Sequence, residues 1–166
     1  TVTEEITGLD LVALQLDVAA GMPLPFDQED VLLEGHAIEV RLYAEDARNQ
    51  FLPQTGDVLL WQPAGGEGVR IDHGLASGGK VSPYYDPMVA KIIAWGEDRE
   101  EARRRLIRAV EDSVLLGVTT NKDFLVATLK HGEFAAGAAT TGFIDRNFPD
   151  GLPQHDEVPG DVAALA

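Results

Sequence analysis

The sequence predicts an α+β fold, in which a mostly antiparallel β-sheet of about four or five strands is flanked by C-terminal helices. Two observations carry this prediction. Between residues 35 and 95, β-branched and aromatic residues recur at period 2, with turn residues between the runs. After residue 98 the apolar period becomes that of a helix. Because the strands do not alternate with helices, a parallel doubly wound sheet is not expected.

Composition limits the function classes. The chain has 166 residues and a net charge of -15, from 28 acidic and 13 basic residues. This length suits one domain with a real hydrophobic core, and the acidity argues against binding to nucleic acid or to an anionic membrane surface. The absence of cysteine excludes disulfides and thiolate metal sites and fits a reducing compartment. No stretch approaches the ~18 apolar residues of a membrane-spanning helix.

The first predicted helix covers residues 9–20. Val12 and Leu16 belong to a broad apolar stripe, and Gly21 stands where a glycine typically ends a helix. So broad a stripe predicts a well-buried helix that needs a partner surface. An irregular acidic connection is expected over 22–34.

Residues 35–46 predict a strand with an unusual pair of charges. Ile38 and Leu42 fall on one side of the period-2 alternation, and Glu39 and Arg41 fall on the other. The arginine is therefore held on a stiff element, where a fixed cation could bind an anionic substrate. Alternatively, both charges belong to a solvated sheet face, as most surface charges do. Spacing alone leaves both interpretations open.

Further strands are predicted over 57–62, 69–73, 80–84 and 87–95. The glycine-rich turn between the first two predicts a hairpin over 57–73. The last of these runs is the most strongly β-prone, because valine, isoleucine and tryptophan dominate it.

Three helices are predicted in the C-terminal part. Asp98 is the expected N-cap of the first, which carries acid–base pairs at i,i+4 spacing, and Thr120 or Asn121 caps the second. From residue 149 the composition is that of a linker. The predicted helical ranges are 99–115, about 121–131, and 141–147.

Two glycine-rich segments lack the context of a nucleotide site. Residues 74–81 match the spacing of a phosphate loop, but Val81 stands where the Mg²⁺-binding hydroxyl is needed and Pro83 interrupts any following helix. Residues 65–68 lack the third glycine of a dinucleotide fingerprint. The histidines share no metal-ligand spacing, and no serine has an evident base partner. The residues alone predict neither a metal site nor a self-contained catalytic site.

The loop over 82–87 is the other unusual run. Tyr84, Tyr85 and Asp86 lie between two prolines that fix the backbone. A rigid loop with these groups suits the support of a binding site. The alternative is that the tyrosines cover the edge of the sheet, and the residues favour neither interpretation.

Five runs match one protein family in order and register: VTEEITGLDLV at 2–12, GHAIEVRLYAED at 35–46, FLP at 51–53, PYYDPMVAK at 83–91 and LGVTTN at 116–121. They resemble the C-terminal part of a biotin carboxylase, as found in acetyl-, propionyl- and methylcrotonoyl-CoA carboxylases and in pyruvate carboxylase. The resemblance covers about residues 1–148 and implies an ATP-grasp ligase. Such an enzyme activates bicarbonate with Mg-ATP as carboxyphosphate and then carboxylates biotin held on a carrier domain.

The resemblance assigns a central role to Arg41. It matches the arginine that lies beside bicarbonate and the biotin ureido oxygen, where it stabilises developing negative charge. By the same resemblance, Glu39 is the neighbour that orients this arginine, and Tyr85 and Asp86 belong to the supporting loop.

Four further positions follow from the family pattern. Thr141 and Gly142 correspond to cofactor-binding positions on the adenine side, although their residue types differ from those of one family branch. Arg70 matches an arginine of the family's dimer interface. Glu67 stands nearby, at a turn position that is often bulky and apolar. A homodimer is therefore expected.

The resemblance also implies what the chain lacks. In the family, the metal-binding glutamates, the phosphate-binding lysines and the glycine-rich lid precede the residue that matches Val2. The chain is therefore expected to be a fragment without the N-terminal ATP-grasp core and to be inactive alone. The expected partners are that core, a biotin carboxyl carrier domain and a carboxyltransferase, in the cytoplasm or the mitochondrial matrix.

Three segments are predicted: a helix and connector over 1–34, a biotin carboxylase C-terminal domain over 35–148, and a linker or tail over 149–166. The alternative function is that of a non-catalytic assembly or dimerisation module that shares the fold.

Overall fold

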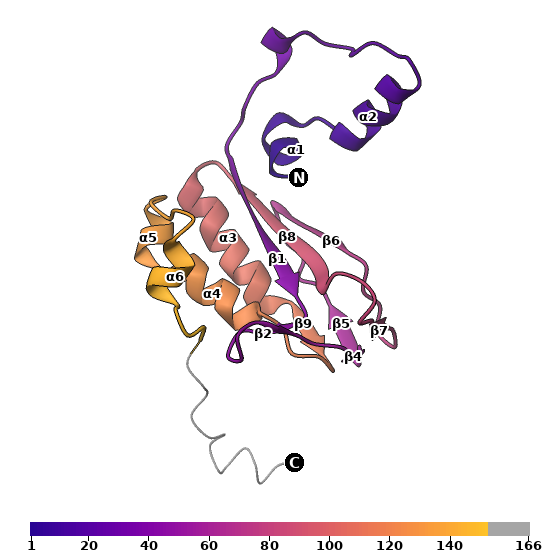
Figure 1. Ribbon diagram of the computed structural model, residues 1–166. Helices are drawn as coiled ribbons and strands as arrows, with labels where there is room; N and C mark the ends of the chain where they lie inside the picture. The colour runs from indigo at the N-terminus through magenta and orange to yellow at the C-terminus, as the bar shows by residue number, and fades with distance from the viewer. Residues whose placement is uncertain (153–166) are drawn as a thin grey trace.

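The structure is a computed structural model that describes residues 1–152. A three-stranded antiparallel sheet lies at its centre, with helices α3 to α6 on one side and the two N-terminal helices beyond one end (Figure 1). The elements are α1 Val2–Thr7, α2 Leu11–Ala19, η1 Gln28–Asp30, β1 His36–Tyr43, β2 Glu45–Asp46, β3 Leu52–Pro53, β4 Gly56–Asp57, β5 Leu60–Gln62, β6 Val69–His73, β7 Lys80–Val81, β8 Met88–Gly96, α3 Arg99–Asp112, β9 Val114–Leu116, α4 Lys122–Lys130, α5 Gly132–Ala135 and α6 Phe143–Asn147.

The central strand of the sheet is β8, which pairs antiparallel with β1 on one side and with β6 on the other. Residues directly opposite one another in an antiparallel pair project from the same face. Two neighbouring rows therefore share one face. They are Glu39, Ile93 and Arg70 in the first row and Arg41, Lys91 and Asp72 in the second.

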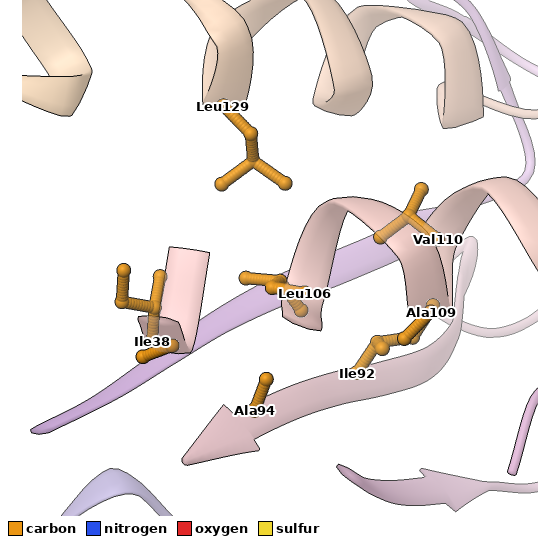
Figure 2. Close-up of a cluster of buried hydrophobic side chains, with 8 residues drawn as sticks. Ile38, Ile92, Ala94, Leu106, Ala109, Val110 and Leu129 are labelled. Atoms are coloured by element: carbon orange, nitrogen blue, oxygen red, sulfur yellow. The ribbon is translucent and has the colours of Figure 1, made fainter. Parts of the chain in front are cut away.

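The opposite face of the sheet forms the larger core. Figure 2 shows Leu106 and Val110 of α3 beside Ile38 of β1 and Ile92 of β8, with Leu129 of α4 pointing toward them. All five side chains are buried. The buried positions of α3 recur at spacings of three and four residues, so the amphipathic helix predicted from the apolar period is confirmed.

The remaining strands form three two-stranded pairs, β2–β3, β4–β7 and β5–β9. A single sheet of four or five strands is therefore wrong, and so is the hairpin over 57–73. The strand predicted over 57–62 breaks at Val58, and its second half pairs with residues 114–116. Val58 and Trp61 both belong to a second buried cluster. Trp61 meets β6 through its side chain only, since its indole N–H donates to His73 Nδ1 at 3.2 Å, while the backbone of the segment pairs with β9.

Two predicted elements are shorter than expected. The helix predicted over 99–115 ends at Asp112, because residues 114–116 are extended and pair with β5. The strand predicted over 80–84 ends at Val81, ahead of a proline, which has no N–H to offer a neighbouring strand.

The predicted helix over 9–20 is present as α2. Asp10 caps it, since the backbone N–H of Ala13 donates to Asp10 Oδ1 at 2.9 Å. The prediction that this helix is well buried is wrong: none of its residues is buried, and Leu16 is 68% exposed. Val12 and Val18 are also more than half exposed, and α2 stands away from the sheet in Figure 1.

The other helices complete the helical side. α4 and α6 lie where the sequence predicts them, whereas α1 and the short α5 are unpredicted. Of the linker predicted over 149–166, residues 153–166 lie outside the described part of the chain. No helix among residues 1–152 is both long enough and apolar enough to cross a bilayer.

Candidate functional site

Arg41 lies on β1, on the sheet face opposite α3, and its side chain is 60% exposed. Glu39 approaches the guanidinium from one side, with 3.8 Å between Arg41 Nε and Glu39 Oε1. The other oxygen of Glu39 accepts a hydrogen bond from the Thr1 hydroxyl. Interaction with the Tyr43 side chain, with smaller contributions from the charges of Glu39 and Asp86, raises the pKa of Arg41. The site therefore holds a permanent and accessible cation.

A hollow of about 530 Å³ adjoins Arg41. Its walls come from the end of β1, from β2, from the start of α4 and from α6. Charged and polar groups come mainly from the strands, and apolar groups come from the β2–β3 turn and the helices. The lining residues are Arg41, Tyr43, Glu45, Phe51, Asn121, Phe124, Leu125, Ile144 and Asp145. A guanidinium at the rim of a partly apolar hollow can hold an anionic group of a larger molecule.

Phe51 occupies a strained backbone position in this lining. It and Gln50 have positive φ values of 55° and 54°, which are uncommon for residues other than glycine. The ring of Phe51 packs edge-on against Phe124, with 4.9 Å between the ring centroids. The turn between β2 and β3 is thereby fixed to α4.

Asn121 is a site residue that the sequence interpretation missed. It was predicted as a possible helix cap, but its side chain binds the backbone of β1. The N–H of Tyr43 donates to Asn121 Oδ1 at 2.9 Å, and Asn121 Nδ2 donates to the Arg41 carbonyl at 3.2 Å. The sequence shows only a capping-type residue at the end of the LGVTTN run, and that signal does not identify a partner about 80 residues away.

The loop over 82–87 projects into solvent. Tyr84 and Tyr85 are 88% and 83% exposed, so they do not cover the sheet edge. Asp86 Oδ1 accepts the backbone N–H of Met88 at 2.8 Å. Tyr85 and Asp86 line a separate hollow of about 220 Å³. Neither residue lines the hollow beside Arg41.

Glu45 is the titratable neighbour of Arg41 with a perturbed pKa. Partial burial raises the pKa of this carboxyl group, and the nearby charge of Asp86 raises it further. The negative charge of Asp86 therefore acts on both Glu45 and Arg41, even though its side chain is exposed.

Thr141 and Gly142 lie just before α6, outside the lining of the Arg41 hollow. The same helix sends Ile144 and Asp145 into that lining. The structure thus brings α6 to the arginine but places the two predicted positions next to the hollow rather than in it.

Arg70 is bound within the chain. Its Nε and Nη2 donate to the two oxygens of Asp72 at 2.9 and 3.0 Å, and its Nη1 donates to Glu4 and Glu5 of α1 at 3.1 and 3.2 Å. These bonds use four of the five N–H groups of a guanidinium. They raise the pKa of Arg70, Asp72 contributing most, and lower the pKa of Asp72. Glu67 is exposed, with 3.8 Å between its Oε1 and Arg105 Nη2. A dimer interface at Arg70 and Glu67 stays a prediction.

Comparison with known proteins identifies the family. The model of the biotin carboxylase C-terminal domain matches residues 39–146. The biotin carboxylase of Halalkalibacterium halodurans is 48% identical over 143 residues, which cover 86% of this chain and 31% of that protein. The alpha subunit of mitochondrial methylcrotonoyl-CoA carboxylase from Rattus norvegicus is 43% identical over 158 residues, which cover 95% of this chain and 22% of that subunit. The chain thus spans between a fifth and a third of the length of these relatives.

A solved structure shares the fold. It is the dimer of the biotin carboxylase domain of Hydrogenobacter thermophilus 2-oxoglutarate carboxylase, in complex with MgADP, ADP and bicarbonate. The TM-score is 0.85 at 37% identity, over 87% of this chain and 32% of that one. This likeness confirms the predicted α+β class with a mostly antiparallel sheet and C-terminal helices. The chain belongs to the biotin carboxylase family and contains the C-terminal domain of that family.

Proposed function

We propose that this chain acts as the C-terminal part of a biotin carboxylase, which carboxylates carrier-bound biotin with bicarbonate and ATP. The observation that carries the proposal is Arg41, an accessible guanidinium fixed on a strand at the rim of a hollow. In this role Arg41 contacts bicarbonate and the ureido oxygen of biotin.

The chemistry of the guanidinium supports this role. Bicarbonate is a planar anion, and a planar fork of N–H donors binds such groups with two parallel hydrogen bonds. In the proposed step, phosphate leaves carboxyphosphate and takes up the N1′ proton of biotin, and N1′ then bonds to the carboxyl carbon. Negative charge builds on the ureido oxygen as that proton leaves. A fixed cation lowers the energy of that transition state, because the protein does not have to reorganise during the step.

The neighbours of Arg41 take supporting roles in the proposal. Glu39 orients the guanidinium from its Nε side, which leaves much of the group open to substrate. Asp86 acts on Arg41 through its charge, and Tyr85 extends the same loop toward the substrate. Thr141 and Gly142, next to the α6 residues of the hollow, are proposed to face the adenine of ATP.

The proposed partners follow from the length of the relatives. Because the chain spans at most a third of them, we place ATP and Mg²⁺ binding on an N-terminal ATP-grasp core. The segment 1–34 connects that core to the C-terminal domain over 35–148. A biotin carrier domain and a carboxyltransferase complete the reaction, in the cytoplasm or the mitochondrial matrix. The homodimer is proposed by analogy with the dimeric relative.

A chimera tests the proposal. The C-terminal domain of the H. halodurans biotin carboxylase is replaced by this chain, and the isolated chain and the truncated H. halodurans core are assayed in parallel. We expect the chimera alone to release ADP in a bicarbonate-dependent reaction and to incorporate labelled bicarbonate into biotin.

Two outcomes would overturn the proposal. If the isolated chain hydrolyses ATP, it is not dependent on a separate core. If the chimera melts cooperatively but neither cleaves ATP nor carboxylates biotin, the chain is better described as an assembly module that shares the fold.

A further inference from the structure

The strand that carries Arg41 has one free edge. β1 pairs with β8 on one side only, and no strand of residues 1–152 pairs with its other side. Backbone N–H and C=O groups on such an edge need partners when water does not reach them. At the end of β1 these groups belong to Arg41 and Tyr43.

Asn121 takes the place of the absent strand. Its side-chain carbonyl accepts the Tyr43 N–H at 2.9 Å, and its side-chain amide donates to the Arg41 carbonyl at 3.2 Å. Its own backbone N–H donates to the Tyr43 carbonyl at 3.1 Å. An asparagine side chain offers both the donor and the acceptor of a peptide group, so one residue satisfies three groups on this edge.

The side chain of Asn121 is committed to this task. The residue is 5% exposed, and although it occupies the N-cap position of α4, its side chain makes no capping hydrogen bond. The first turn of α4 instead uses Thr120, whose hydroxyl accepts the Lys122 N–H at 3.4 Å. Asparagine is a favoured N-cap residue, but the side chain of Asn121 binds β1 and not the first turn of α4.

The contact lies at the point where β1 stops pairing regularly. Arg41 is opposite Lys91 and Leu42 is opposite Ala90, and the register shifts between Leu42 and Tyr43. Tyr43 therefore follows the irregularity, and Asn121 binds it from the other edge of the strand. The side-chain amide of Asn121 also binds the Arg41 carbonyl, two residues earlier on the same edge. Asn121 also lines the hollow beside Arg41.

We propose that Asn121 is a positioning residue, which fixes the backbone of β1 at Arg41 and so directs the guanidinium toward the substrate. The inference rests on the proposed function for its catalytic part, whereas the anchoring of the strand is independent of it. Asn121 does not touch the reacting atoms and acts through Arg41.

Hydrogen exchange of the 166-residue chain tests the anchoring. In Asn121→Ala the Tyr43 amide loses its acceptor, and we expect it to exchange about ten-fold faster or more, while Ile92 and Ile93 of β8 keep their wild-type rates. Asn147→Ala is the matched control, because Asn147 Nδ2 also binds a backbone carbonyl, that of Phe143, at 2.9 Å. That variant leaves the Tyr43 amide protected.

A second variant separates the two side-chain bonds. Asn121→Asp keeps the acceptor for the Tyr43 N–H but places a carboxylate oxygen against the Arg41 carbonyl. We expect the Tyr43 amide to stay protected and biotin carboxylation by the chimera to fall. If Asn121→Ala does not fold, biotin carboxylation by the Asn121→Asp chimera still tests whether the bond to the Arg41 carbonyl positions the arginine.

A double-mutant cycle in the chimera tests the catalytic part. We expect Asn121→Asp to lower kcat for biotin carboxylation by about ten-fold, with the KM for ATP unchanged, and to cause no further loss when Arg41 is already alanine. Unchanged Tyr43 protection in Asn121→Ala, or an additional loss in the Arg41→Ala background, overturns the inference. If Arg41→Ala alone has no effect on carboxylation, the proposed function fails, and the catalytic part of the inference fails with it. Hydrogen exchange of the Tyr43 amide then still tests whether Asn121 anchors β1.

Discussion

Replacing Leu106 by alanine tests where the stability of the fold resides. Leu106 is completely buried between α3 and the sheet, next to Ile38 and Ile92 (Figure 2). Leu→Ala substitutions in cores cost about 2–5 kcal/mol, and the cost is larger where the surroundings cannot collapse into the cavity. Because two paired strands hold the neighbours of Leu106 in place, we expect about 3–5 kcal/mol.

Urea unfolding of the 166-residue chain, followed by circular dichroism, measures this cost. With an m-value of about 2 kcal/mol/M, a loss of ~4 kcal/mol lowers the midpoint by about 2 M. The control is Leu16→Ala, the same substitution on the exposed stripe of α2, which should change the free energy of unfolding by less than about 0.5 kcal/mol. Equal shifts for the two variants would refute the assignment of the core.

Three further predictions concern the backbone and the charges. Gly117→Ala should lower the free energy of unfolding by about 2 kcal/mol or more, because at φ 107° the new Cβ would lie 2.0 Å from the Asp57 carbonyl oxygen; a melting temperature equal to wild type would contradict this. Arg70 lowers the pKa of Asp72 from 3.8 in the folded state. The Asp72 carboxylate therefore stabilises the fold above pH 3.8, and this stabilisation is lost as the pH falls through the lowered pKa. The free energy of unfolding should therefore depend less on pH in the acid range for Asp72→Asn than for wild type. The pKa of Glu45 is raised from 4.5, so the folded state loses stability as the pH rises through the raised value; Glu45→Gln should be more stable than wild type at pH 7, and thermal melts giving the reverse order would show the sign to be wrong.

Local patterns predicted the elements that carry the site. The alternation over 35–46 placed Ile38 and Leu42 in the core and left Arg41 exposed, as the structure confirms. The Asp98 cap is also confirmed, since its Oδ1 accepts the Glu101 N–H at 2.8 Å. Such features depend on residues within one or two turns of each other, so the sequence is enough to find them.

Long-range pairing could not be predicted in the same way. The strand over 57–62 reads as half of a hairpin, yet its second half pairs with residues more than fifty positions away. Its partner strand is the segment that directly follows α3, and no pattern within 57–73 contains that information. Asn121 shows the same limit, because a helix-capping residue and a strand-binding residue look alike until the fold brings β1 and α4 together.

Substitution of Arg41 in the chimera tests the central claim most directly. The measurement is incorporation of labelled bicarbonate into biotin by Arg41→Ala, beside the matched control Arg104→Gln on the solvent-exposed side of α3. Loss of one charge-stabilising donor typically lowers kcat by about 10²–10³-fold, and we expect a loss of this size for Arg41→Ala and none for the control. Carboxylation within about two-fold of the parent chimera would contradict the assignment of Arg41 to the reaction.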